Sequence, residues 1–151
     1  MTYANMKLNQ YQQVNSQSAE YADPHRLIQM LMEGFITRTA EAKAAMERGD
    51  INAKNTAVKK ACGILHGLLD SLDFDKGGEL ASNLASMYFY QEKTLLLGHS
   101  RNEPEKLDEV MRLMREVKAG WDGIRDEAVE QPASTKAPAA PANAGSISVS
   151  G

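Results

Sequence analysis

The chain has 151 residues, of which 25% are charged, and its net charge at pH 7 is −3, a length and composition typical of one globular domain. No region has the clustered Lys and Arg of a nucleic-acid-binding protein, no apolar run approaches the roughly 18 residues of a membrane span, and residues 1–11 lack the pattern of a secretory signal. Because the single cysteine, Cys62, also excludes an intramolecular disulfide, we expect a cytoplasmic protein without membrane insertion.

The first predicted helix covers residues 24–48. Asp23 stands directly before it and can accept hydrogen bonds from the amide groups that a helix leaves unpaired at its start. Pro24 suits the first helical position because it has no N–H group to leave without a partner. Gly49 ends this helix, and its expected apolar side consists of Leu27, Ile28, Leu31, Phe35, Ala42 and Met46, which recur at helical spacing.

Two further helices are expected over residues 51–72 and 79–98. Asp50 can cap the earlier of them. Residues 73–78 separate the two helices, because the paired glycines at the end of this segment disfavour a helix. The expected apolar sides contain Val58, Ala61, Cys62, Leu65, Leu68, Leu69 and Leu72 in the earlier helix, and Leu80, Leu84, Met87, Tyr88, Gln91 and Leu95 in the later one.

A fourth helix is expected to begin after Asn102, which we predict as its N-cap. Pro104 falls in the first turn, and Glu105, three residues after the cap, completes the pattern of a capping box. Its apolar residues form a near-heptad seam: Leu107, Val110, Met114, Val117, Trp121 and Ile124. Four helices of similar length, short connections and the absence of a strand pattern predict an all-α fold, an antiparallel four-helix bundle.

Two segments are expected to flank the bundle, which we assign to residues 23–130. Residues 1–22 are polar, with isolated apolar residues such as Tyr11 and Val14, and are predicted to form an N-terminal arm that folds back weakly on the bundle. Residues 131–151 are mostly Pro, Ala, Ser and Gly. Because such a segment has too few apolar groups to offset the entropy lost on ordering, we expect a disordered C-terminal tail.

The sequence lacks the patterns of the metal and catalytic sites that helical bundles contain. None of its histidines lies three residues after a Glu, so the Glu-x-x-His pairs of di-iron bundles are missing, and so is the His-Glu-x-x-His zinc motif. Cys62 lies among apolar residues, where a thiol is typically a small hydrophobic group with a raised pKa. We therefore expect no enzyme activity, no metal and no cofactor.

His66 leaves a second interpretation open, a four-helix signalling or adaptor module that transfers phosphoryl groups or docks other proteins. Histidine phosphotransfer domains resemble His-x-x-Lys-Gly around the accepting residue, where the lysine helps to hold the phosphoryl charge. Leu69 and Asp70 occupy those two positions here. Because an acidic residue repels a phosphoryl group, the sequence favours a structural role for His66.

The second and third predicted helices carry more apolar residues than one buried stripe needs. Two interpretations fit this excess: a wide core with ordinary surface residues, or a groove that accepts amphipathic helices of a partner. Tyr88 and Tyr90 lie about 200° apart around a helix of 3.6 residues per turn, so one of them is expected near the surface.

Three motifs, in order, resemble the family of the flagellar export chaperone FliS, over about residues 11–121. The family's pattern of a Pro followed by Leu-Ile-x-Met-Leu-Tyr-Asp-Gly is matched by Pro24 and residues 27–34, with Met32 in place of Tyr and Glu33 in place of Asp. Residues 72–90 are similar to its Leu-Asp…Gly-Gly-Glu-Ile-Ala-x-Asn-Leu…Leu-Tyr-x-Tyr run, and residues 107–121 to its last helix.

The resemblance implies a cytoplasmic chaperone that holds the C-terminal segment of flagellin, which is disordered in the monomer and helical in the filament. Covering this segment would block premature polymerisation until the export apparatus, through a component of its gate, takes the subunit. Tyr11 and Val14 are expected to cover the groove in the free protein. The expected groove residues are Ile64, Leu68, Leu72, Leu84, Tyr88 and Tyr90, with Asn83 as a polar registration point, and simple core packing is the alternative for each leucine.

Overall fold

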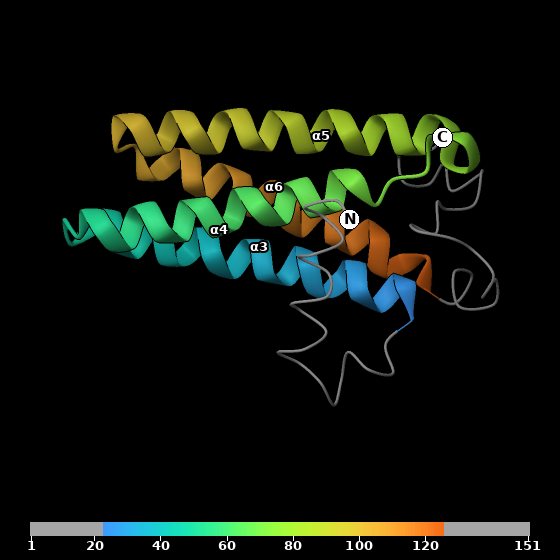
Figure 1. Ribbon diagram of the computed structural model, residues 1–151, viewed down its shortest axis with the longest axis horizontal. Coiled ribbons are helices and arrows are strands. Elements are labelled where there is room, and N and C mark those ends of the chain that lie inside the picture. Colours follow the sequence, from blue (N-terminus) through green and yellow to red (C-terminus); the bar gives the residue numbers. More distant parts are fainter. Residues whose placement is uncertain (1–22, 126–151) are drawn as a thin grey trace.

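The computed structural model describes residues 23–125, and within this range the chain forms four helices and no strand (Figure 1). The predicted arm with Tyr11 and Val14, the predicted tail and the last residues of the assigned domain lie outside the described residues. In chain order, the helices are α3 (Pro24–Glu47), α4 (Ile51–Asp70), α5 (Phe74–Arg101) and α6 (Pro104–Gly123).

The four helices run up and down in alternation, and each packs against its neighbours in the chain (Figure 1). Helix α3 contacts α4 and α6, and α5 contacts the same two helices from the opposite side, so the bundle closes on itself. The predicted all-α antiparallel four-helix bundle is therefore confirmed. This topology brings the start of α3, the α4–α5 connection and the end of α6 to one end of the molecule.

Three helices begin at an aspartate whose carboxylate accepts a hydrogen bond from the backbone amide three residues later. Asp23 Oδ1 lies 2.7 Å from the amide of Arg26, and Asp50 Oδ1 lies 3.0 Å from that of Ala53, which confirms both predicted caps. Asp73 caps α5 in the same way, through the amide of Lys76. These bonds satisfy amide groups that have no partner within the helix.

The predicted break between the second and third helices is partly confirmed. Helix α4 ends at Asp70, two residues earlier than expected, and α5 begins already at Phe74. Gly78, with φ 52° and ψ −127°, interrupts α5, so residues 74–77 form a separate turn and the continuous helix starts at Glu79 as predicted. The positive φ of Gly78 is a conformation that residues with a side chain rarely adopt.

The predicted start of the fourth helix is wrong. Asn102 has the left-handed conformation, φ 53° and ψ 52°, and is the C-cap of α5, while Glu103 is the N-cap of α6 and makes no side-chain cap bond. Because only two residues separate the helices, Asn102 has to end α5 and cannot take the extended conformation of an N-cap. Its side chain instead accepts a hydrogen bond of 2.8 Å from Lys54 Nζ on α4.

The core fills the space between the helices and includes the whole predicted seam of α6, from Leu107 to Ile124. The expectation for the two tyrosines of α5 is also confirmed. Tyr88 is buried, with 1% of its surface exposed, whereas Tyr90 is 49% exposed.

At Gly98 of α5, the start of α6 lies so close that a methyl group has no room. A Cβ atom built there would lie 2.7 Å from Leu107 Cδ1, 2.9 Å from Lys106 Cβ and 3.2 Å from the Glu103 carbonyl oxygen. Substitution of Gly98 by Ala is expected to lower the free energy of unfolding by about 1–3 kcal/mol, since the backbone around Lys106 has to move. Denaturant titration measures this loss.

Gly67, in α4, provides the matched control, because a Cβ atom at this position would have nothing within 4 Å. Substitution of Gly67 by Ala is expected to raise the free energy of unfolding by about 0.5–1 kcal/mol, the difference in helix propensity. Equal effects of the two substitutions would contradict the close approach of α5 and α6 at Gly98.

Candidate functional site

Cys62 and His66, the side chains considered for catalysis, have surroundings that do not favour a reaction. Within residues 23–125, no three His, Cys, Asp or Glu side chains gather as a metal site would require. Burial raises the pKa of the Cys62 thiol to about 11, with Glu92 adding to the effect, so the reactive thiolate is disfavoured. His66 Nε2 lies 2.6 Å from the Glu92 carboxylate, a second acidic group that would oppose a phosphoryl group on this ring.

None of the helices in the described part of the chain is long and apolar enough to cross a membrane.

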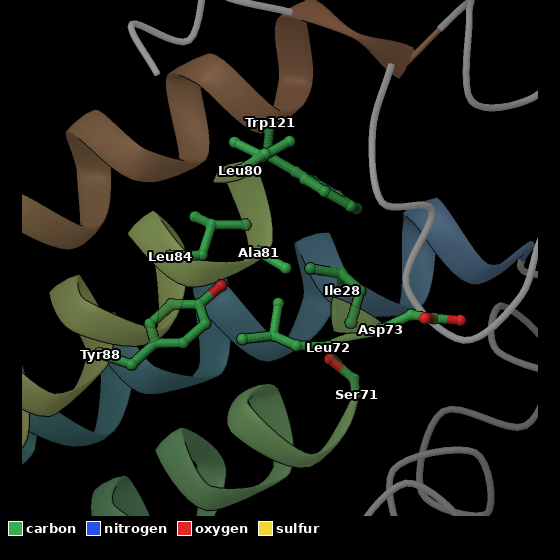
Figure 2. Close-up of a pocket in the computed structure, with 9 residues that line it drawn as sticks. All are labelled: Ile28, Ser71, Leu72, Asp73, Leu80, Ala81, Leu84, Tyr88 and Trp121. Carbon is green, nitrogen blue, oxygen red and sulfur yellow. The ribbon is translucent and has the colours of Figure 1, made fainter. Parts of the chain in front are cut away.

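A small, mostly apolar pocket lies at the end of the bundle where α3 begins and α6 ends (Figure 2). All four helices or their connections contribute to it, and its open space has room for about one water molecule. Three of the predicted groove residues, Leu72, Leu84 and Tyr88, line it. The full set of lining residues is Ile28, Ser71, Leu72, Asp73, Leu80, Ala81, Leu84, Tyr88 and Trp121.

The other predicted groove residues lie elsewhere. Ile64 and Leu68 are fully buried in the core on α4. Asn83 is partly exposed on α5. The exposed Tyr90 donates a hydrogen bond of 2.5 Å to the Glu109 carboxylate on α6, away from the pocket lining.

The polar side chains that line the pocket are already bonded within the protein, with one exception. Ser71 Oγ donates to the Leu68 carbonyl oxygen at 2.7 Å, Asp73 caps α5, and Trp121 Nε1 donates to the His25 carbonyl oxygen at 3.1 Å. The Tyr88 hydroxyl has no hydrogen-bond partner within residues 23–125, and Figure 2 shows it turned toward the other lining side chains.

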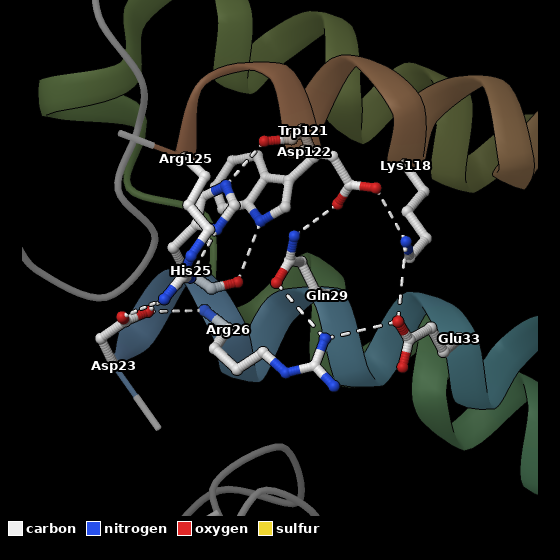
Figure 3. A network of polar contacts seen from close by, with 9 residues as sticks. All are labelled: Asp23, His25, Arg26, Gln29, Glu33, Lys118, Trp121, Asp122 and Arg125. Atoms are coloured by element: carbon white, nitrogen blue, oxygen red, sulfur yellow. Dashed lines mark hydrogen bonds and ion pairs between the residues drawn. The ribbon is translucent and has the colours of Figure 1, made fainter. Parts of the chain in front are cut away.

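Trp121 belongs both to the pocket and to a polar network that joins α3 to α6 (Figure 3). Its ring stacks on that of His25, with 4.6 Å between the ring centres and 4° between the planes. His25 Nε2 lies 2.6 Å from the Trp121 carbonyl oxygen, to which it donates, while Trp121 Nε1 donates back to the His25 carbonyl. The two residues thus satisfy each other's backbone at a point where both are buried.

Arg125 extends this pair to the start of α3. Its guanidinium lies 2.8 Å from Asp23 Oδ2 and 3.3 Å from His25 Nδ1 (Figure 3). Burial lowers the pKa of His25, and the Arg125 charge lowers it further against the opposing hydrogen bond to Trp121. Burial acts to raise the pKa of Asp23, but the hydrogen bonds from Arg125 and from the Arg26 amide, together with the Arg125 charge, outweigh it and the pKa is lowered. These contacts therefore favour a neutral His25 imidazole beside an ionised Asp23 carboxylate.

A second branch of the network continues along the same two helices. Gln29 of α3 donates to the Asp122 carboxylate, which also accepts a hydrogen bond of 2.8 Å from Lys118 Nζ. Lys118 in turn lies 3.6 Å from Glu33. Burial acts to raise the pKa of Asp122, but the bonds from Lys118 and Gln29 outweigh it and the pKa is lowered.

Sequence reasoning does not predict the pairing of His25 with Trp121 and Arg125. The heptad seam identifies Trp121 as buried, but no local pattern links residues 96 positions apart. The sequence also does not identify Ile28, Leu80 and Ala81 as pocket residues. Periodicity places the first two on the apolar sides of their helices, which is the only signal the sequence carries for them.

The chain is similar to proteins of known role over the whole bundle. A family model described as flagellar protein FliS matches residues 7–128. The flagellar secretion chaperone FliSB of Pseudomonas aeruginosa is 47% identical over 123 residues, which cover 81% of this chain and 98% of that protein. The flagellar secretion chaperone FliS of Salmonella typhimurium is 37% identical over 128 residues, covering 83% and 95%, and that of Vibrio cholerae is 38% identical over 106 residues, covering 70% and 78%.

Proposed function

Because the chain belongs to the FliS family of flagellar chaperones, we propose that it binds the C-terminal segment of flagellin in the cytoplasm and keeps it from polymerising before export. The observation that carries this proposal is the family match, which spans all four helices and the pocket. The similar proteins are secretion chaperones and not enzymes. Delivery of the bound flagellin to a component of the export gate completes the proposed role.

The pocket is the proposed anchor point for the flagellin segment. Leu72 and Leu84 offer apolar surface there, and an amphipathic helix binds such a surface through its own apolar side. The partly exposed Asn83 and the exposed Tyr90 are the members of the proposed groove that lie nearer the surface of α5. Ile64 and Leu68 are buried, so contact with them requires the bundle to open.

Calorimetric titration of the full chain with the last ~40 residues of flagellin from the same organism tests the proposal. We expect saturable binding of one segment per chain with a large negative change in heat capacity, since coupled folding and binding buries about 1,000–3,000 Å². Absence of binding by the folded chain would remove the proposed function.

The N-terminal arm is proposed to compete with flagellin, through Tyr11 and Val14, for the same apolar surface. Deletion of residues 1–18 is therefore expected to tighten flagellin binding, because the free protein then has no covering segment to displace. Deletion of residues 133–151, which carry no large aromatic residue, is the matched control and is expected to leave the affinity unchanged. Weaker or unchanged binding after the first deletion would contradict competition by the arm.

A further inference from the structure

Helix α5 carries two large apolar side chains on the side that faces away from the core. Phe89 is 59% exposed and Leu96 is 43% exposed, whereas Tyr88 and Leu95, which precede them, are buried in the core. Because Phe89 and Leu96 are seven residues apart, almost two full turns, they lie on one side of the helix. Scattered exposed apolar residues are ordinary, but neighbouring ones mark a binding surface.

These two residues adjoin the part of α5 already proposed to bind flagellin. Tyr90, which is 49% exposed, lies on the side of α5 toward α6, where it bonds Glu109. Phe89 is its neighbour, about 100° around the helix. Seven residues further on, Leu96 and the partly exposed Leu97 repeat the arrangement of Phe89 and Tyr90. The apolar surface is therefore continuous along the outside of α5.

One charged residue stands among these apolar side chains. Lys93 is exposed and lies four residues after Phe89 and three before Leu96, so it belongs to the same side of the helix. It forms no ion pair within residues 23–125, and the adjacent Glu92 is bonded to His66. A lysine in a contact between helices favours a partner with an acidic residue opposite it. The outer α5 surface is our name for Phe89, Tyr90, Lys93, Leu96 and Leu97.

The outer α5 surface is too small to bind a separate partner by itself. Phe89, Tyr90 and Leu96 are about half exposed and offer on the order of 300 Å² together, since large apolar side chains have about 150–250 Å² of surface each. A stable interface between two molecules, including two copies of this chain, needs roughly 800 Å² per partner. A contact of this size is useful to a segment that is already held nearby, because it then forms within one complex.

The flagellin segment that we propose to bind at the pocket is such a ligand. Leu84, at the pocket, and Leu96 are twelve residues apart on α5, roughly 18 Å at ~1.5 Å per residue. A segment of ~40 residues extends over about 60 Å as a helix. One part of it can therefore lie at the pocket while another part reaches Leu96.

We propose that the outer α5 surface is a second contact for the flagellin segment, beyond the pocket. The segment runs along the outside of α5 as an amphipathic helix, with apolar side chains on Phe89 and Leu96 and an acidic residue beside Lys93. This inference rests on the proposed function and adds to it the surface that the segment covers and the charge that the segment carries there.

The double substitution Phe89→Gln and Leu96→Gln tests the apolar part of this contact. Calorimetric titration of the full-length variant with the flagellin segment is expected to show an affinity lowered by about 10- to 100-fold, because apolar surface that the complex buries is lost. The thermal unfolding midpoint of the free protein is expected to stay the same, since both side chains already face water and Gln is a good helix former.

Ile51→Gln is the matched control for the double variant. Ile51 is 67% exposed, but it begins α4 at the end of the bundle away from the pocket, so flagellin binding is expected to stay unchanged. Light scattering of the free chain tests the other possible occupant, a second copy of this chain. The inference is overturned if the double variant binds flagellin as tightly as the unaltered chain does, whether or not the substitutions turn a dimer into a monomer.

Lys93→Glu and Lys93→Gln test the charge of the contact. At low salt, Lys93→Glu is expected to bind flagellin about 3- to 10-fold more weakly than Lys93→Gln, because it places two like charges side by side. In about 1 M salt, where the screening length is about 3 Å, this difference is expected to disappear. Equal affinities of the two variants at low salt would overturn the acidic contact. Failure of the unaltered chain to bind flagellin would overturn the proposed function, and this inference with it.

Discussion

Substitution of Trp121 by Ala is expected to lower the free energy of unfolding by about 3–5 kcal/mol, the cost of removing a large aromatic side chain from a packed core. Trp121 is 4% exposed and stacks on His25. The substitution also leaves the buried His25 carbonyl without the indole N–H that bonds it. Because Trp121 is the only tryptophan in the chain, unfolding of this variant is followed by far-UV circular dichroism rather than by fluorescence.

The same substitution is expected to weaken flagellin binding, since Trp121 forms one wall of the pocket. Met114→Ala is the matched control: Met114 is fully buried on the same helix but does not line the pocket. It is expected to cost about 2–5 kcal/mol of stability and to leave the affinity of the folded fraction unchanged. Equal losses of affinity in the two variants would mean that stability alone, and not the pocket, controls binding.

Acidification is expected to destabilise the bundle in the range where histidine titrates. Burial lowers the pKa of His25, and burial together with Lys54 lowers that of His99, so the unfolded chain binds more protons than the folded one. Stability is therefore complete above the unfolded value of 6.5 and falls as the pH drops below it. The slope reaches at most about 1.4 kcal/mol per pH unit for each proton taken up.

Three charged groups face His25. Asp23 precedes its own helix, α3, while Asp122 and Arg125 lie at and just after the end of α6. The pKa values of both aspartates are lowered, so they add a separate loss of stability only as the pH falls below 3.8. Denaturant titrations between about pH 8 and pH 5 isolate the contribution of the histidines.

Substitution of His25 by Gln keeps a donor for the Trp121 carbonyl but removes the titrating ring, and is expected to flatten the dependence of stability on pH. His66→Gln is the control, because His66 is exposed and bonded only to Glu92 among the described residues. If His25→Gln keeps the slope of the unaltered chain, the imidazole of His25 is not the group that takes up the proton.

The sequence is sufficient for those parts of the fold that local bonds determine. Asp23 and Asp50 each bond an amide three residues ahead, so their role as caps can be identified without knowing the rest of the molecule. The prediction for Asn102 is wrong for the opposite reason. Asn102 could by its position end α5 or begin α6, and local sequence does not decide between the two. The hydrogen bond that it accepts from Lys54, 48 positions away, belongs to the tertiary structure.

The residues of the candidate site are harder to predict from the sequence than the fold is. Helical periodicity identifies the apolar side of α4, but it does not tell whether α5 covers Leu68 or leaves it open, and the structure shows Leu68 buried. The angle between Tyr88 and Tyr90 around a single helix is enough to predict that one of them lies near the surface. The lack of a partner for the Tyr88 hydroxyl could not be predicted, because it depends on the neighbours that four helices supply together.

The salt bridge between Asp23 and Arg125 has a mechanical consequence. It holds the first and last residues of the described bundle side by side, so tension transmitted through the two flanking segments acts at one end of the molecule. Such tension is expected to peel α3 away from α6 one turn after another, starting near the stacked rings of His25 and Trp121. A bundle loaded in this direction gives way turn by turn, whereas one pulled from opposite ends would have to shear all of its contacts at once.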